Sequence, residues 1–304
     1  MMQLTLNQDI QMPMIGFGTY LITNDEVKTV VLEALRSGYR HIDTAEAYGN
    51  EEGVGQAIQA GRQELGLARK DIFVTTKLWP GNDAWGQPVK TYQSTIESLN
   101  QSLSNLKLDY VDLYLIHAPL AKDQRLEQWK ALVALRQMGK VRAIGVSNFN
   151  ITHIEEIKSA GLPLPDANQI ELHPWSQKPA LTSYLRDHNI ASIAYSSLVP
   201  LSTWRTAPGQ DSAKTDAMKQ AGAEADSPFK IMAQKYGVSE AQVLLRWGLQ
   251  KGYAILPKST NKTRIRQNSD VLSFEIDDAD LTVIEKMDRG DGVAWSFGDP
   301  TKVS

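Results

Sequence analysis

The sequence predicts an α/β fold, a (β/α)8 TIM barrel that forms a single domain over residues 1–304. Three observations lead to this expectation. Short apolar segments alternate with amphipathic segments of helical period, the alternation is repeated eight times, and no low-complexity linker divides the chain. A doubly wound open sheet fits less well, because the Gly-x-Gly-x-x-Gly motif is incomplete after the first strand, where the chain has only GFGTY.

The apolar segments are short and continuously apolar, which is typical of buried parallel strands. We expect strands at residues 14–20, 41–45, 72–78, 111–118, 141–148, 167–173, 191–198 and 253–259. An N-terminal hairpin is expected before the first of them, and long loops are expected at the C-terminal face of the barrel.

The segments between the strands are typical of amphipathic helices, and residues 25–38 and 91–108 are clear examples. Gly38 is placed to end the first helix as a C-terminal cap glycine. Between Leu201 and Pro228 the chain is too long and too polar for a simple connector, which indicates a lid, a binding loop or a disordered insertion.

Composition excludes several functional classes. The chain is 42% apolar and 22% charged, as in ordinary soluble globular proteins, and it has neither a signal-peptide pattern nor an apolar run of transmembrane length. The absence of cysteine excludes disulfides and thiolate chemistry, and the five histidines lack the spacing of a zinc site. A net charge of −3 gives no basic footprint for nucleic acid. We therefore expect a cytoplasmic protein with no metal, nucleic-acid or membrane partner.

Polar residues stand where successive apolar segments end. Asp43, Lys77 and His117 close the second, third and fourth expected strands, and Tyr48 lies in the loop after Asp43. In a (β/α)8 barrel the active site lies at the C-terminal ends of the strands, so these four side chains are expected to converge on one mouth. Four later polar residues are expected at the same face: Ser147, Asn148, Gln169 and Glu171.

Each of these residues also has an ordinary structural interpretation. Asp43 could cap a turn and His117 could be a hydrogen-bonded core histidine, whereas a buried Lys77 would require a partner for its charge. His173 is interpreted as structural, because the following Pro174 indicates a turn. The convergence of an acid, a phenol, a lysine and an imidazole is what favours an active site.

The chain resembles the aldo-keto reductases over nearly its whole length. The motifs that carry the resemblance are GFGTY, GYRHIDTAEAYGNEEGVG, TTKLW, LYLIHAP, GVSNF, QIELHP, AYSSL and ILPKST. The resemblance implies a monomeric enzyme that reduces aldehydes and ketones to alcohols with NADPH, and it places Asp43, Tyr48, Lys77 and His117 in the catalytic tetrad.

The chemistry of carbonyl reduction agrees with that implication. A nicotinamide supplies a hydride, and a protein acid must supply a proton at neutral pH. Tyrosine, with an ordinary pKa of about 10, is too weak an acid unless a neighbouring ammonium favours its phenolate, which is the role expected of Lys77 beside Tyr48. Asp43 would then compensate the burial of Lys77. A neutral His117 would orient the carbonyl oxygen.

The resemblance also implies a set of residues that bind NADP(H). They are Gly18, Thr19, Ser147, Asn148, Gln169, Tyr195, Ser196, Leu198, Lys258, Ser259, Thr260, Arg264, Gln267 and Asn268. Within the set, Ser147, Asn148 and Gln169 would surround the nicotinamide carboxamide. Tyr195 would stack on the ring, since an aromatic plate fixes which face is presented to substrate.

The segment KSTNKTRIRQN, residues 258–268, contains four cations and no acid. A solvated helix face could have this composition. After the eighth strand of a barrel, however, a phosphate is often bound near the N-terminus of an extra helix, so the segment suits the 2′-phosphate of NADPH. By resemblance Lys258, Ser259 and Arg264 take that role.

Substrate-binding residues are expected to be Tyr20, Trp79, Ala118, Trp204 and Trp295. Ala118 stands where many members of the family have tryptophan, so it is expected to widen the pocket beside His117. An apolar pocket of this kind makes few exclusive demands, and a diketo-sugar acid, a 2-oxoaldehyde and an aromatic aldehyde remain open as substrates.

Two other functions remain open on the same scaffold. One is a cofactor-binding regulatory subunit, as the potassium-channel β-subunits are. The other is a barrel enzyme that acts on phosphorylated metabolites, in which the basic segment would hold the substrate.

Overall fold

The computed structural model describes residues 2–7, 10–201, 227–290, 292–295 and 298–303. Its centre is an eight-stranded sheet in the order β3 to β10, with every neighbouring pair parallel. The strands are β3 (Phe17–Gly18), β4 (His41–Asp43), β5 (Phe73–Leu78), β6 (Val111–Ile116), β7 (Val141–Ser147), β8 (Ala167–Glu171), β9 (Ala191–Tyr195) and β10 (Ala254–Ile255). Each lies within a segment that the sequence predicts as a strand.

The sheet closes on itself between its first and last strands. Ile15 forms a parallel bridge with Ile255, the backbone N–H of Gly16 donates to the Ile255 carbonyl at 2.9 Å, and that of Gly18 donates to the Pro257 carbonyl at 3.1 Å. The predicted (β/α)8 barrel is confirmed. Its closing strands are only two residues long, and Pro257, which has no N–H to donate, follows soon after β10.

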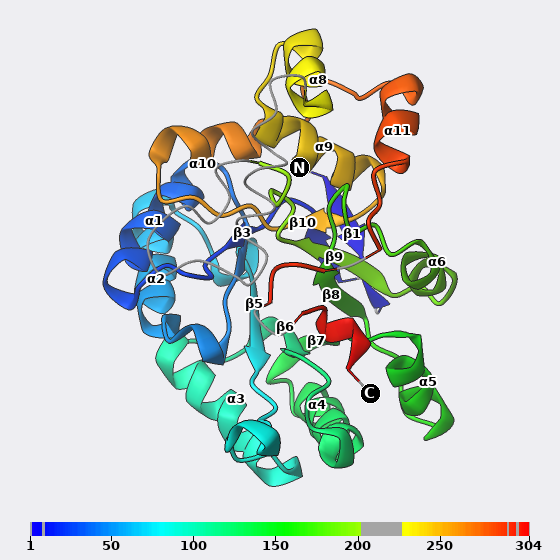
Figure 1. Ribbon diagram of the computed structural model, residues 1–304. Helices are drawn as coiled ribbons and strands as arrows, with labels where there is room; N and C mark the ends of the chain where they lie inside the picture. The colour runs from blue at the N-terminus through cyan, green and yellow to red at the C-terminus, as the bar shows by residue number, and fades with distance from the viewer. Residues whose placement is uncertain (1, 8–9, 202–226, 291, 296–297, 304) are drawn as a thin grey trace.

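Helices surround the strands (Figure 1). They are α1 (Asn24–Arg36), α2 (Glu51–Leu65), α3 (Tyr92–Leu106), α4 (Arg125–Gln137), α5 (Ile151–Ser159), α6 (Pro179–Asp187), α8 (Pro228–Tyr236), α9 (Glu240–Gln250), α10 (Lys262–Ser269) and α11 (Asp278–Glu285). Helix α1 shows why they form: Val27, Val31 and Leu35 recur every four residues and are fully buried. Beyond its end Gly38 has φ +94°, as expected of a capping glycine.

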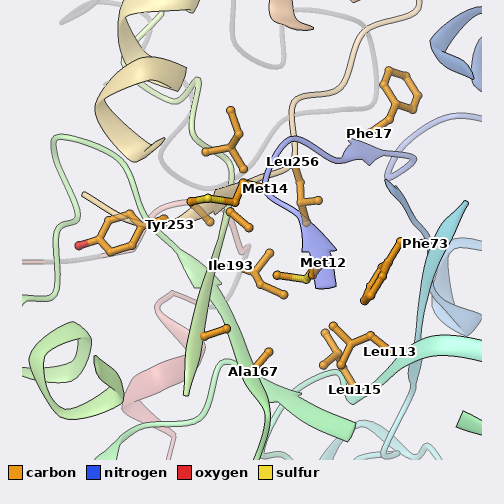
Figure 2. Packing of buried hydrophobic residues seen from close by; sticks show 14 of the residues in the cluster. Met12, Met14, Phe17, Phe73, Leu113, Leu115, Ala167, Ile193, Tyr253 and Leu256 are labelled. Carbon is orange, nitrogen blue, oxygen red and sulfur yellow. The ribbon is translucent and has the colours of Figure 1, made fainter. Parts of the chain in front are cut away.

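The predicted N-terminal hairpin pairs β1 (Gln3–Thr5) with β2 (Gln11–Pro13). Met12 of β2 is fully buried in the same apolar cluster as the barrel residues Phe73 and Ile193 (Figure 2). The Pro13 carbonyl contacts His41 Nδ1 at 3.1 Å, where β4 begins. The hairpin therefore lies at the N-terminal ends of the strands and leaves their C-terminal ends to the polar residues.

Among the described residues, no helix combines the length and the apolar character that crossing a bilayer requires.

Candidate functional site

Lys77 lies at the centre of the polar cluster. The parallel strands β4 and β5 pair Asp43 with Thr75, so Lys77, two residues further along β5, points to the same face as Asp43. Its Nζ donates to Asp43 Oδ1 at 2.6 Å, to the Thr44 carbonyl at 2.9 Å and to the Tyr48 hydroxyl at 3.3 Å. The three N–H groups of the ammonium thus have three acceptors.

The charge of Lys77 is held in a buried place. The side chain is fully buried, and burial lowers the pKa of its ammonium, while the negative charge of Asp43 opposes that effect. Asp43 is itself buried and receives a second hydrogen bond, from Gln169 Nε2 to Oδ2 at 2.8 Å. Both members of this ion pair are hydrogen-bonded, which is the condition under which a buried pair is tolerated.

Gln169 contributes to this arrangement from the opposite side of the barrel. It lies on β8, beside Ser147 of β7, whose Oγ donates to the Gln169 carbonyl at 2.8 Å. From the sequence Gln169 is predicted to bind the nicotinamide carboxamide, and its contact with Asp43 was not expected. The carboxamide role remains a prediction.

Tyr48 ends a short 3-10 helix, Glu46–Tyr48, that follows β4. Gly49 closes the helix with φ +63°, a left-handed conformation that glycine adopts without steric cost. The half-buried Tyr48 ring lies 5.0 Å from the ring of Tyr20 and 5.6 Å from that of His117, centroid to centroid. Tyr48 therefore contacts Lys77 through its hydroxyl and lies edge-on to His117 through its ring.

His117 follows β6 and is 6% exposed. Burial and the nearby charge of Lys77 hold its pKa well below the usual 6.5, so the ring is neutral at neutral pH. Among the described residues, its Nδ1 is buried and has no hydrogen-bond partner. A neutral imidazole carries one N–H, and because Nδ1 is buried, only Nε2 could present that N–H to a carbonyl oxygen in the mouth of the barrel.

Aromatic side chains form the wall beside His117. Trp79 and Trp295 lie 5.6 and 5.8 Å from the His117 ring, both edge-on, and stack on each other at 6.4 Å with planes 12° apart. Trp85 stacks on the outer side of Trp79 at 6.4 Å. Trp79 and Trp295 are predicted from the sequence to bind substrate. Trp85 is not, although it follows Trp79 by only six residues.

Trp295 is held by the segment that crosses the front of the barrel near β7 and β8 (Figure 1). Buried Glu171, at the end of β8, accepts the backbone N–H of Val293 at 2.8 Å and that of Ala294 at 3.0 Å. Its Oε1 also contacts His173 Nε2 at 2.8 Å, which agrees with the structural interpretation of His173.

Trp295 also joins the predicted nicotinamide residues. Its Nε1 donates to the Tyr195 hydroxyl at 2.9 Å, and that hydroxyl donates to Asn148 Oδ1 at 2.7 Å. Asn148, with φ +64°, in turn donates from Nδ2 to the His117 carbonyl at 2.9 Å. Burial raises the pKa of Tyr195 well above 10, so it stays a phenol. The structure brings Tyr195, Asn148 and Ser147 together at the mouth.

Other residues named from the sequence lie less centrally or cannot be placed. Ala118 is fully buried, so its methyl group exposes no surface to the mouth, and its assignment to the substrate pocket remains a prediction. Tyr20 is 45% exposed beside Tyr48. Trp204 lies outside the described residues.

The basic segment forms the turn before α10 and the helix itself. Asn261 caps the helix by accepting the Arg264 backbone N–H at 3.1 Å, and Ser259 Oγ accepts the Arg264 Nε–H at 3.4 Å. Ser259 and Arg264 thus lie side by side at a helix N-terminus, as a phosphate site would require. Lys258 is half-buried, Asn268 is buried, and both Thr260 and Gln267 are exposed.

The positive charge of this segment is smaller than its own sequence suggests. Glu33 of α1 accepts from Arg266 Nη2 at 2.9 Å and lies 3.8 Å from Lys262 Nζ. The segment itself contains no acidic residue, but in the folded protein Glu33 of α1 partly neutralises two of its four cations, Lys262 and Arg266. Lys258 and Arg264 remain the two cations predicted to bind a phosphate.

A cavity of about 650 Å3 lies outside the barrel mouth, between α2, α3 and the loop before α3. Glu46, Glu51 and Lys90 are among its lining residues, and none of the four candidate catalytic residues is. It is therefore not the place where a carbonyl would meet Tyr48.

Comparisons with known proteins agree with this geometry. A family model described as "Aldo/keto reductase family" matches residues 14–289. Methylglyoxal reductase DkgA of Escherichia coli is 38% identical over 280 residues, covering 92% of this chain and 90% of the relative. Glyoxal reductase of Bacillus subtilis is 37% identical over 289 residues, covering 95% and 93%. The crystal structure of a Bombyx mori aldo-keto reductase in complex with NADP matches with a TM-score of 0.82 and 34% identity, covering 95% and 93%.

Proposed function

Because the chain belongs to the aldo/keto reductase family and reduces aldehydes and ketones with NADP(H), we propose that Tyr48 is the proton donor of this reaction. The observation that carries the proposal is the contact of the Tyr48 hydroxyl with Lys77 Nζ at 3.3 Å, inside a buried network that Asp43 completes. NADPH, when bound, supplies the hydride that adds to the carbonyl carbon.

The protein side of the reaction is the delivery of one proton. The O–H bond of Tyr48 breaks as the proton moves to the carbonyl oxygen, and the phenolate left behind is stabilised by the ammonium of Lys77. Solvent then returns a proton to Tyr48. The neutral His117 donates a hydrogen bond that orients the carbonyl oxygen towards Tyr48.

The residues present fit NADP(H) at two places. Ser147, Asn148 and Gln169 offer hydroxyl and amide groups at the mouth, where they would hold the carboxamide, and Tyr195 would pack against the nicotinamide ring. At the start of α10, Lys258, Ser259 and Arg264 would hold the 2′-phosphate. The side-by-side placement of Ser259 and Arg264 supports this assignment.

We propose small 2-oxoaldehydes as the substrate class. The wall that Trp79 and Trp295 form beside His117 would suit a compact carbonyl compound, and relatives bear the names methylglyoxal reductase and glyoxal reductase. A diketo-sugar acid and an aromatic aldehyde are the competing substrates.

A kinetic panel tests both the acid and the substrate class. NADPH oxidation is followed with methylglyoxal, an aromatic aldehyde and a diketo-sugar acid, for the wild type and for Tyr48→Phe. We expect the highest kcat/KM for methylglyoxal and a kcat at least ~10²-fold lower in the variant, with NADPH affinity intact. Wild-type turnover by Tyr48→Phe would remove Tyr48 from its role. A higher kcat/KM for either competitor would reject the substrate class alone.

A further inference from the structure

Glu46 lies two residues before Tyr48 in the same 3-10 helix, and its carboxylate turns away from the barrel mouth. Oε2 accepts the backbone N–H of Trp79 at 3.1 Å, and Oε1 accepts from Lys90 Nζ at 2.9 Å. One carboxylate therefore connects the turn that carries Tyr48 to both ends of the loop between Trp79 and Lys90.

The rest of that loop is fixed at the same two ends. Gln128 of α4 donates from Nε2 to the Pro80 carbonyl at 3.1 Å and to the Lys90 carbonyl at 2.8 Å. The Lys90 backbone N–H donates to the Pro80 carbonyl at 2.9 Å, and its Nζ also donates to Ser98 Oγ of α3 at 2.6 Å. These contacts tie the loop to the outer helices. Glu46 is the side chain that ties it to the turn of Tyr48.

The position of the Trp79 indole follows from this anchoring. Its Nε1 donates to Gln87 Oε1 of the same loop at 2.8 Å, and its ring lies 5.6 Å from the ring of His117. Because the indole is hydrogen-bonded within the loop, a shift of the loop backbone would move the Trp79 ring with it. The backbone N–H that Glu46 accepts belongs to the residue that bears this ring.

We propose that Glu46 is a positioning residue that sets the distance between the Trp79 wall and Tyr48 and thereby determines which carbonyl substituents the mouth accepts. The proposal rests on the proposed role of Tyr48 and on Trp79 contacting substrate. A hydrogen bond to a carboxylate is stronger than one between neutral groups, so its loss frees the start of the loop. A large aromatic substituent would contact the Trp79 ring and so depends on the position of that ring, whereas a small aldehyde would not reach it.

The test measures kcat and KM of the wild type and of Glu46→Ala, Glu46→Gln and Lys90→Met at saturating NADPH. Each protein is assayed with a small aldehyde and with a bulky aromatic aldehyde. We expect Glu46→Ala to raise KM for the aromatic aldehyde about tenfold, an effect of the size that one charged hydrogen bond contributes. The kcat for the small aldehyde and the dissociation constant of NADPH should change less than about twofold. Glu46→Gln keeps an oxygen for the Trp79 N–H and should recover most of the wild-type KM.

Two further measurements separate positioning from a loss of structure. In a Trp79→Ala background, Glu46→Ala should have no further effect on the aromatic KM, because the wall that it positions is gone. Lys90→Met removes the ion pair and leaves the Trp79 contact, so it should keep the wild-type ratio of the two KM values. The proposal is overturned if Glu46→Ala leaves that ratio unchanged, if its effect persists without Trp79, or if Lys90→Met reproduces it. None of these outcomes depends on whether Tyr48→Phe is active, which tests the proposed function separately.

Discussion

The candidate catalytic cluster and the basic segment of α10 differ in where their polar groups find hydrogen-bond partners. Lys77 and Asp43 are buried and form their hydrogen bonds with each other, with the Thr44 carbonyl just after β4 and, across the barrel, with Gln169 of β8. Arg264 is exposed and contacts Ser259 at 3.4 Å, and Arg266 is exposed and paired with Glu33. Folding of the barrel therefore fixes the positions of the candidate catalytic side chains. The proposed phosphate site combines the exposed Arg264 with the buried Ser259 and the half-buried Lys258 at the start of a helix.

The largest expected effect is the loss of stability on removing Lys77, which tests the buried cluster. Lys77→Met leaves Asp43 buried without its cation, which costs about 3–5 kcal/mol of the free energy of unfolding. Arg264→Met removes an exposed cation and should change it by less than about 0.5 kcal/mol. Urea denaturation measures both.

A double variant provides the control for Lys77. Adding Asp43→Asn to Lys77→Met removes the uncompensated charge and should recover much of the lost stability. Equal free energies of unfolding for Lys77→Met and Arg264→Met would mean that breaking the buried Asp43–Lys77 ion pair does not destabilise the folded protein.

The second half of the comparison is tested by cofactor affinity. Lys258→Ala and Arg264→Ala should each weaken NADPH binding about tenfold or more, since a charge-assisted contact contributes about 1.5–3 kcal/mol, and should leave NADH binding nearly unchanged. Added salt should narrow the preference for NADPH. Quenching of tryptophan fluorescence measures the dissociation constants.

Arg266→Ala is the matched control, because Arg266 lies on the same helix but faces Glu33. It should retain the wild-type preference. Equal dissociation constants for NADPH and NADH in the wild type would reject this segment as a 2′-phosphate site, and an equal loss in Arg266→Ala would show that the effect is one of general charge.

The smallest expected effect concerns the buried imidazole. The pKa of His117 is depressed in the folded protein, so below pH 6.5 the unfolded chain binds a proton that the folded chain does not. The free energy of unfolding should therefore fall as the pH falls below 6.5, by about 1.4 kcal/mol per pH unit for this histidine. His117→Gln should have a shallower pH dependence of unfolding. An unchanged slope would mean that His117 takes up its proton in the folded state as easily as in the unfolded chain.

Side-chain contacts between neighbouring strands could be predicted from the sequence, whereas contacts between distant elements could not. The Asp43–Lys77 pair could be expected because their strands are adjacent, and each predicted strand segment contains an observed strand. The bond from Gln169 to Asp43 crosses the barrel, and Glu33 reaches Arg266 across 233 positions of the chain. A pattern along one segment carries no information on such contacts.

The contact of Glu46 with Trp79 was missed for a related reason. Glu46 stands inside the motif that revealed Asp43 and Tyr48, but its partner is a backbone N–H, and every residue except proline has one. The partner of Glu46 could be identified only once the positions of the 3-10 helix and of the end of β5 were known.

A single-turnover experiment tests most directly whether Tyr48 donates the proton to the carbonyl substrate while the exposed cations of α10 serve only to bind NADPH. Wild type, Tyr48→Phe and Arg264→Ala are saturated with NADPH, mixed with methylglyoxal, and followed by the loss of NADPH absorbance. Saturation removes any binding defect, so Arg264→Ala should react at the wild-type rate and Tyr48→Phe at least ~10²-fold more slowly. A wild-type rate for Tyr48→Phe, or an equal slowing of both variants, would contradict the claim.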